Sequence, residues 1–153
     1  MHIDSAAGNI VWVVNSEIYN HEELRETVLS DVDLSWTSCD SAVVGYLYQK
    51  FGPSHKVVDV LDGIFCGVVY DESTGEFFAF RDPIGINSLY WGKAADGAYW
   101  FASEMKGLHD TCESFDVFPP GHVYYSKSDK LERFYSPTWI DTSIVPTEKV
   151  DRS

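Results

Sequence analysis

The spacing of apolar residues changes along this chain and predicts two differently built halves. In the first half, the apolar run from Ile10 to Val14 predicts a strand that ends at the polar segment from Asn15 to Glu17. Helical spacing follows, because apolar residues then recur three and four positions apart. It predicts three helices, over Asn20 to Leu29, over Asp40 or Ser41 to Tyr48, and over Val57 to Leu61.

Polar residues stand where these helices are expected to begin. Asn20 is followed by Glu23 at the third helical position, which is the pattern of a capping box. Asp40 and Ser41 are both residue types that cap helix N-termini. We therefore expect the Asn20 side chain to cap the first helix, and Asp40 or Ser41 to cap the second.

The second half of the chain has the period of strands. The apolar runs Gly63 to Tyr70 and Glu76 to Phe80 predict two antiparallel strands that are covered on both faces. Alternating residues around turn signals predict two further hairpins, Asn87 to Gly92 with Ala98 to Ala102, and Gly121 to Ser126 with Lys130 to Phe134. Helices followed by antiparallel strands indicate an α+β fold.

The two ends of the chain suggest a piece of a longer protein. The first predicted strand looks central, yet only a short loop precedes it. After Tyr135 the patterning weakens around Pro137 and Pro146, which is typical of a linker. We therefore expect a domain over residues 1–136 that is truncated at its N-terminus, followed by a linker over residues 137–153.

Composition narrows the class of protein. The chain has 153 residues, 44% of them apolar, which suffices for one domain with a hydrophobic core. The net charge of −13 makes nucleic acid an unsuitable partner, because such a surface repels phosphates. No apolar run reaches the length of a membrane span. Cys39, Cys66 and Cys112 have no metal-ligand spacing, so we expect reduced thiols, no metal site and a cytoplasmic location.

The polar end of the first strand offers chemistry as well as a turn. The side-chain amide of Asn15 and the N–H of Ser16 could together hold a developing oxyanion. Glu17 adds a carboxylate, and Asp40 offers a second one that could hold an ammonium group. On spacing alone, an Asn in a turn and an Asp at a helix cap are the commoner uses of these residues.

Six motifs in one order raise the weight of the functional interpretation. They are VNSEIYNHEELR, TSCDSAVVGYLY, LDGIFCGVVYD, FAFRDPIGINSLYWG, FASEMKGL and FPPGHVYYS. Together they closely resemble the glutaminase domain of glutamine-hydrolysing asparagine synthetases, which are class II glutamine amidotransferases. The resemblance covers Ile10 to Tyr135. It implies the four-layer αββα sandwich of N-terminal-nucleophile hydrolases.

The resemblance also implies roles for individual residues. The family's Asn-Gly-Glu motif falls on Asn15, Ser16 and Glu17, which would form the oxyanion hole and contact L-glutamine. The family's glutamine-binding Asp falls on Asp40, which would pair with the substrate's α-ammonium group. The motifs around Arg81, Ser103 and Pro119 match segments that we interpret as structural. No cofactor is implied for this domain, whereas ATP and Mg²⁺ are expected for an absent synthetase domain that amidates aspartate.

Two departures from the family pattern bear on activity. The family's nucleophile is an N-terminal Cys, and here His2 follows Met1. The Arg that clamps the glutamine carboxylate in the family also has no match in this sequence. Ser16 replaces the family's Gly, which would cost on the order of 1 kcal/mol if that residue needed a positive φ. We therefore expect no glutaminase activity from this chain alone.

Other interpretations remain open. The chain could derive from another class II amidotransferase, although SEMKGL and FPPGH favour asparagine synthetase. It could also be a non-catalytic domain kept for folding or partner contacts. The sequence leaves a homodimer open. If the first interpretation holds, Asn15, the Ser16 N–H, Glu17 and Asp40 should converge on one shallow cleft at the ends of the sheet strands.

Overall fold

The computed structural model describes residues 1–4 and 8–136, so the predicted linker over residues 137–153 lies outside the described residues. Four helices are present in the described part: α1 (His21–Glu26), α2 (Ala42–Phe51), α3 (Lys56–Asp59) and α4 (Lys106–His109). Its strands are β1 (His2–Ile3), β2 (Ile10–Ile18), β3 (Gly63–Asp71), β4 (Glu76–Arg81), β5 (Tyr90–Lys93), β6 (Tyr99–Ala102), β7 (Ser114–Val117), β8 (His122–Tyr125) and β9 (Lys130–Arg133).

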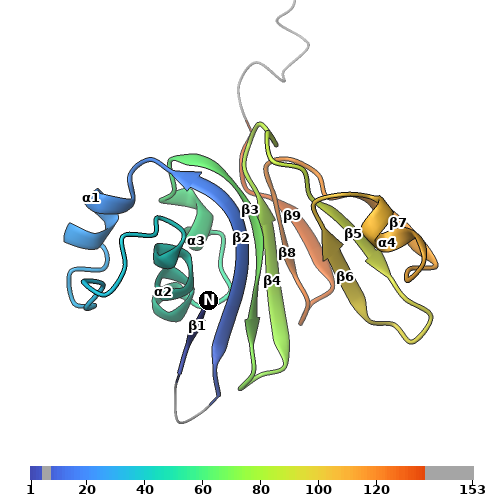
Figure 1. Ribbon diagram of the computed structural model, residues 1–153, viewed down its shortest axis with the longest axis horizontal. Coiled ribbons are helices and arrows are strands. Elements are labelled where there is room, and N and C mark those ends of the chain that lie inside the picture. Colours follow the sequence, from blue (N-terminus) through green and yellow to red (C-terminus); the bar gives the residue numbers. More distant parts are fainter. Residues whose placement is uncertain (5–7, 137–153) are drawn as a thin grey trace, which may run out of the picture.

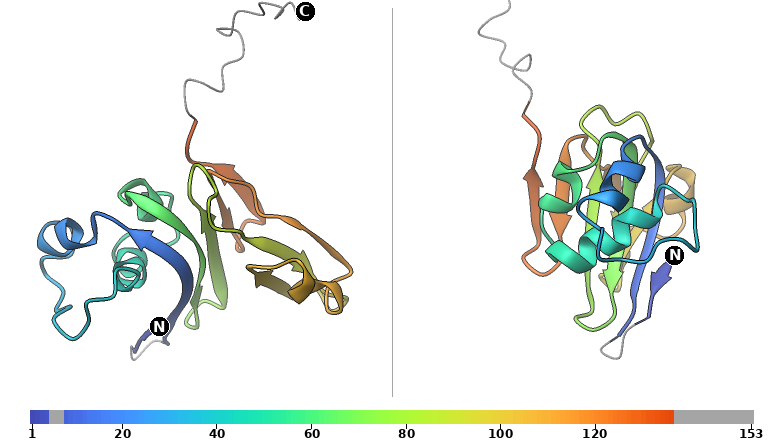
Figure 2. Two further views of the ribbon diagram at one scale, coloured as in Figure 1. Left: turned by 45° about the horizontal axis from the view of Figure 1, so that its top comes forward. Right: turned by 90° about the vertical axis from the view of Figure 1, so that its left-hand side faces the viewer.

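The strands form two stacked sheets. The larger has six strands in the order β1-β2-β3-β4-β8-β9, and the smaller has three in the order β6-β5-β7, all antiparallel. Figures 1 and 2 show α1, α2 and α3 together on one face of the larger sheet, with the smaller sheet on the opposite side. The short helix α4 packs against β5 and β6 and completes the order of layers. The predicted α+β sandwich is confirmed, with its outer helical layer reduced to one turn.

The larger core lies between the helices and the six-stranded sheet. Trp12 and Ile18 of β2 are buried there, as are Val43, Val44 and Leu47 of α2. These three α2 residues share the helix face that their spacing predicts. The Trp12 ring lies over Gly45, where a Cβ atom would come within 2.4 Å of it. The predicted second helix and its buried face are confirmed, but the helix runs to Phe51 instead of Tyr48, and the Ser41 side chain makes no capping bond.

A second core, rich in aromatic rings, lies between the two sheets. Phe77 of β4 packs against the rings of Tyr99, Phe101 and Tyr124, with ring centroids 5.3 to 5.6 Å apart. The Tyr124 hydroxyl, which would otherwise be buried without a partner, contacts the Tyr99 hydroxyl at 2.9 Å and the Asp129 carboxylate. The prediction that β3 and β4 pair antiparallel between a helical layer and a second sheet is confirmed.

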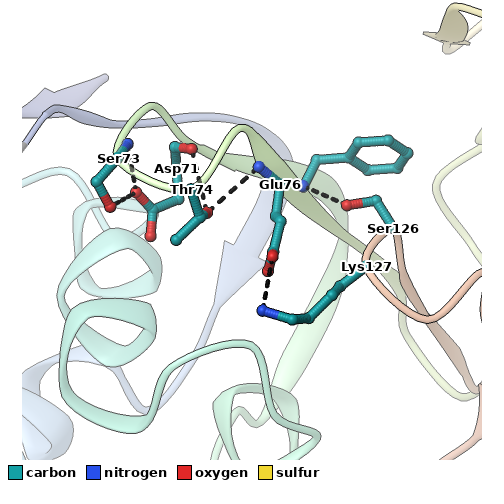
Figure 3. A network of polar contacts seen from close by, with 7 residues as sticks. Asp71, Ser73, Thr74, Glu76, Ser126 and Lys127 are labelled. Atoms are coloured by element: carbon teal, nitrogen blue, oxygen red, sulfur yellow. Dashed lines mark hydrogen bonds and ion pairs between the residues drawn. The ribbon is translucent and has the colours of Figure 1, made fainter.

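The β3–β4 hairpin is closed by side chains that satisfy the turn's own backbone (Figure 3). One carboxylate oxygen of Asp71 accepts hydrogen bonds from the backbone N–H and the hydroxyl of Ser73, at 2.9 and 2.6 Å. Glu76 and Lys127 form an ion pair at 2.8 Å that joins this hairpin to the β8–β9 turn. These contacts fix the end of the sheet furthest from Asn15 along β3.

Two predictions about the first helix are wrong. The helix ends at Glu26 instead of Leu29, because the backbone leaves helical angles at Thr27 (φ −110°, ψ −84°) and the Leu29 N–H bonds to the Leu24 carbonyl, five residues back. Asn20 precedes the helix but makes no capping bond. Its side chain instead donates to the Val60 carbonyl and accepts from the Asp62 N–H, so it ties the start of α1 to the loop before β3.

The predicted end of the first strand is also wrong. β2 continues through the polar segment to Ile18, and all nine of its residues pair with β3. The polar residues did not stop the strand because the β3 ladder satisfies their backbone groups on one side. Two short strands, β1 and β7, were not predicted, since two and four residues give too little periodicity.

Candidate functional site

The site is built on the part of the β2 edge that extends beyond the short strand β1, which pairs only with Ile10 and Val11. In an antiparallel pair, successive residues direct their N–H groups alternately toward the partner strand and away from it. The Trp12 N–H bonds to the Met1 carbonyl, at 2.9 Å, and not to β3. The Ile18 N–H bonds to the Asp40 carboxylate, also away from β3. By the same alternation, Val14 and Ser16 direct their N–H groups outward, into the gap between Met1 and Asp40.

Asp40 closes one end of this gap. One of its carboxylate oxygens accepts the Ile18 N–H at 2.7 Å, and the Cys39 thiol lies 3.9 Å from the other. Asp40 is half-buried and precedes α2, whose N-cap residue is Ser41. Asp40 therefore binds the strand edge and does not cap the helix through its side chain. A carboxylate oxygen has more than one lone pair, so the oxygen beside the Cys39 thiol can still accept a further donor.

The loop before Asp40 is held by an arginine that the sequence analysis did not assign to the site. Arg25 of α1 donates to the carbonyls of Leu34 and Thr37 at 3.0 and 2.8 Å. It also donates to the carbonyl of Cys39 at 2.8 Å, directly before Asp40. No sequence pattern indicates that an arginine binds three carbonyls of one irregular loop, so this role is visible only in the folded structure.

Asn15 and Glu17 lie on the other face of β2, toward the smaller sheet. Their exposure alternates with burial at Trp12 and Ile18, as expected for opposite faces of a strand. Asn15 lines an open cleft of about 370 Å³ between the sheets, together with Cys66, Leu89 and residues 99–103. Val13, two residues along the same face, is 75% exposed. The Ser16 side chain points toward the helices, and its buried hydroxyl has no partner among the described residues.

The four predicted site residues are therefore neighbours over the last four positions of β2. Asn15, Ser16 and Glu17 are consecutive within β2, and Asp40 reaches the same strand at Ile18. Two residues of a strand span about 7 Å, which separates the Ser16 N–H from the Asp40 contact. Asp40 does not line the cleft that contains Asn15. The arrangement is a line of polar groups along one edge, with Asn15 and Glu17 on its cleft side.

Ser16 carries no backbone strain. Asp129 is the only residue other than glycine with a positive φ in the described part of the chain. Ser16 is an ordinary strand residue paired opposite Phe65. The conditional cost of replacing the family's Gly therefore does not arise, and the Ser16 N–H keeps the orientation that the strand imposes.

None of the described cysteines suits a nucleophile at this site. Cys66 faces Asn15 across the β2–β3 ladder and lines the same cleft. Burial raises the pKa of its thiol to about 11, so it is protonated at neutral pH. Cys39 is half-buried beside Asp40 and Ser41, and Cys112 is buried beyond Gly92 on the outer side of the smaller sheet. Cys66 and Cys112 are therefore buried thiols, whereas Cys39 is only half-buried.

The motif around Arg81 is structural, as predicted. Arg81 is 6% exposed and donates to the carbonyls of Gly85, Asn87 and Phe118 at 2.7, 2.9 and 2.7 Å. Asp82 is buried and accepts the N–H groups of Ile84 and Gly85. This loop brings Asn87 against β2, where its side-chain amide donates to the Asn15 carbonyl at 3.0 Å. No sequence pattern assigns this contact to Asn87.

Comparison with known proteins shows the family of this chain. A family model described as "Glutamine amidotransferase domain" matches residues 1–110. The chain belongs to the glutamine amidotransferase family. A nodule asparagine synthetase (glutamine-hydrolysing) of Pisum sativum is 46% identical over 94% of this chain and 24% of its own length. Asparagine synthetase 1 (glutamine-hydrolysing) of Arabidopsis thaliana is 43% identical over 95% of this chain and 26% of its own length.

The amidotransferase chain thus spans about a quarter of these relatives. Among solved structures, an allosteric regulatory enzyme of purine biosynthesis aligns with a TM-score of 0.73 over 90% of this chain and 31% of its own, at 21% identity. A glutamine phosphoribosylpyrophosphate amidotransferase from B. subtilis aligns with a TM-score of 0.71 over 88% of this chain and 31% of its own, at 22% identity. These structures share the fold, which is that of the N-terminal-nucleophile hydrolases.

Neither a membrane-spanning helix nor a metal-binding cluster is present among the described residues of this amidotransferase domain. None of its helices in residues 1–4 and 8–136 is long and apolar enough to cross a membrane. In the same residues, no group of three or more His, Cys, Asp or Glu side chains is placed to hold a metal ion.

Proposed function

We propose that this chain is the glutaminase part of a glutamine-hydrolysing asparagine synthetase and that it binds L-glutamine along the edge of β2. The observation that carries the proposal is the pair formed by the outward Ser16 N–H and the Asp40 carboxylate, about 7 Å apart on one strand edge. An extended glutamine needs such a spacing, because its side-chain amide and α-ammonium group lie several ångströms apart.

The roles follow from the charges that the reaction develops. Attack on the glutamine amide places negative charge on its oxygen, which the Ser16 N–H and the Asn15 amide would stabilise. Asp40 and Glu17 would hold the α-ammonium group through ionic hydrogen bonds. The attacking thiolate would come from an N-terminal Cys, which this sequence does not match. We therefore expect this chain to bind glutamine without hydrolysing it.

The ammonia released in the whole protein would be used elsewhere. We propose a synthetase domain that consumes ATP with Mg²⁺ to amidate aspartate, joined through residues 137–153. The identity to plant asparagine synthetases over nearly all of this chain supports that choice over other class II amidotransferases. A cytoplasmic location fits the same proposal. Sedimentation of the purified chain would decide whether the homodimer left open by the sequence forms.

The decisive experiment measures binding and then turnover. Isothermal titration should detect L-glutamine binding to this chain, with no glutamate released above the rate in buffer. Fusing an in-frame segment that exposes an N-terminal Cys should restore hydrolysis. In that fusion Asn15→Ala should slow turnover by about 100-fold or more, as for a lost oxyanion donor. Asp40→Ala should mainly raise KM.

Three results would contradict the proposal. One is glutamate release by this chain that a Cys66→Ser change abolishes. Another is identical behaviour of Asn15→Ala and Asp40→Ala in the fusion. A chain that binds no glutamine, with or without the added segment, would instead favour the non-catalytic domain.

A further inference from the structure

We propose that Asn87 is a positioning residue for the oxyanion site: through the Asn15 carbonyl, it orients and polarises the peptide that carries the Ser16 N–H. This inference deepens the proposed function and rests on it. It assigns work to a residue that lies 72 positions from Asn15 in sequence.

The Asn15 carbonyl and the Ser16 N–H belong to the same planar, trans peptide, so they point in opposite directions. The Ser16 N–H points to the free edge of β2, and the Asn15 carbonyl therefore points toward β3, where Asn15 is paired with Cys66. A carbonyl oxygen has two lone pairs, so it can accept a further donor beside its partner strand.

Asn87 supplies that donor. Its Nδ2 group lies 3.0 Å from the Asn15 oxygen. Because a carbonyl can only accept, the amide of Asn87 donates. A donor on the carbonyl increases the polarity of the whole peptide, and hydrogen bonds in such chains strengthen one another. The Ser16 N–H thereby becomes a better donor toward an oxyanion at the edge, and the peptide resists rotation.

The loop that presents Asn87 is itself anchored. The buried guanidinium of Arg81 binds the Asn87 backbone carbonyl at 2.9 Å and the Gly85 carbonyl at 2.7 Å. Asp82 holds the same loop through the N–H groups of Ile84 and Gly85, at 2.9 and 2.6 Å. Arg81 contacts the backbone of residue 87, so replacing the Asn87 side chain leaves the anchor in place. The Asn87 side chain thus connects the buried Arg81 motif to the candidate site.

The first test reads the peptide directly in this chain. In ¹⁵N,¹³C-labelled protein, Asn87→Ala and Asn87→Asp should both reduce the one-bond coupling between the Asn15 carbonyl carbon and the Ser16 nitrogen, because the C–N double-bond character falls. The same coupling one peptide pair earlier, between the Val13 carbonyl carbon and the Val14 nitrogen, should not change. Asn20→Ala is the matched control, since Asn20 also donates its Nδ2 group to a carbonyl, that of Val60 at 2.9 Å. Unchanged coupling in both Asn87 variants would overturn the proposal.

The second test asks whether the polarised N–H acts on a ligand. L-Methionine sulfone presents a tetrahedral sulfonyl oxygen near the place of the glutamine amide, and L-norvaline has the same α-ammonium and carboxylate without that acceptor. Loss of one hydrogen bond's net effect predicts binding of the sulfone about three- to tenfold weaker in Asn87→Ala. Norvaline binding should change less than twofold, and Asn20→Ala should change neither.

The outcomes separate this inference from the proposed function. Equal weakening of sulfone and norvaline would mean that Asn87 supports only the general structure, and would overturn the inference while glutamine binding stands. Failure of the wild-type chain to bind any of these amino acids would refute the proposed function, and with it the oxyanion role of Ser16. The coupling measurement would then still report whether Asn87 polarises the peptide.

Discussion

The two faces of β2 have opposite properties although they belong to one strand. On the face toward the helices, Trp12 and Ile18 are each 2% exposed and belong to the larger core. On the face toward the smaller sheet, Val13 is 75% exposed, and Asn15 and Glu17 are exposed beside an open cleft. The helix-facing side supplies the stability, and the polar edge and cleft side are left free to meet a ligand.

A rigid strand can carry polar side chains when its opposite face is buried. Buried apolar area holds β2 in place, at roughly 25 cal/mol per Å² of surface removed from water. The exposed side chains then need no packing partners of their own. Site residues on such a strand are positioned by contacts made on its far side, which is why substitutions on the two faces should differ in kind.

The largest effect should follow from Trp12→Ala. The ring fills the space above Gly45, and its Nε1 donates to the Ser41 carbonyl at 3.0 Å. Removing a fully buried Trp should lower the free energy of unfolding by about 3–5 kcal/mol. Urea unfolding followed by circular dichroism would measure it. A loss below about 1 kcal/mol would mean that the helix-facing side does not hold the strand.

The second-largest effect concerns the burial of the Cys66 thiol in the wall of the cleft, which makes stability depend on pH. Burial raises the pKa of Cys66 from 9.0 to about 11, so the folded state keeps its proton where the unfolded state loses it. The stabilisation is complete below pH 9 and is lost as pH rises from 9 to 11. Stability should fall over this window by about 2 kcal/mol more in the wild type than in Cys66→Ala. Tyr48, whose pKa burial raises to about 12, acts in the same direction in both proteins.

That comparison is made by urea unfolding at pH 8, 9, 10 and 11. Parallel pH profiles of wild type and Cys66→Ala would show that water reaches the thiol through the cleft. The cleft-facing side of β3 would then be accessible to water, like the cleft-facing side of β2.

Gly45→Ala should have a smaller effect on the helix-facing side. The new methyl group would lie 2.4 to 2.5 Å from the Trp12 ring, and overpacking of this kind costs about 1–3 kcal/mol. Ala favours a helix over Gly by about 1 kcal/mol, which offsets part of that cost. We expect the free energy of unfolding to fall by about 1 kcal/mol. The near-ultraviolet circular dichroism of the protein, to which Trp12 contributes, should also change. A net gain in stability would show that the ring moves freely.

Val13→Ser should have the smallest effect. Its side chain is mostly in water, so stability should change by about 0.5 kcal/mol or less. Thermal unfolding beside Trp12→Ala gives the contrast between the two faces directly. A loss comparable to that of Trp12→Ala would mean that a further segment or a second molecule covers the cleft in solution.

Much of the fold could be predicted from the sequence because it depends on local periodicity. The α2 helix follows from Val43, Val44 and Leu47, and the β3–β4 hairpin follows from two apolar runs around a turn. The prediction failed where polar residues have several uses. Asn20 was expected to cap α1 but binds Val60 and Asp62, since nothing local shows that the loop before β3 passes there.

The sequence by itself determined the class of fold, the family pattern and the identity of Asn15, Ser16, Glu17 and Asp40 as candidates. Only the tertiary structure decided that β2 runs through these residues, that Ser16 faces a free edge and that Asp40 closes its end. The same holds for Arg25 and Asn87, which act on backbone carbonyls. Every residue has a carbonyl, so no local sequence pattern shows which carbonyl a distant side chain will bind. Only the packing of the folded chain brings the side chain and the carbonyl together.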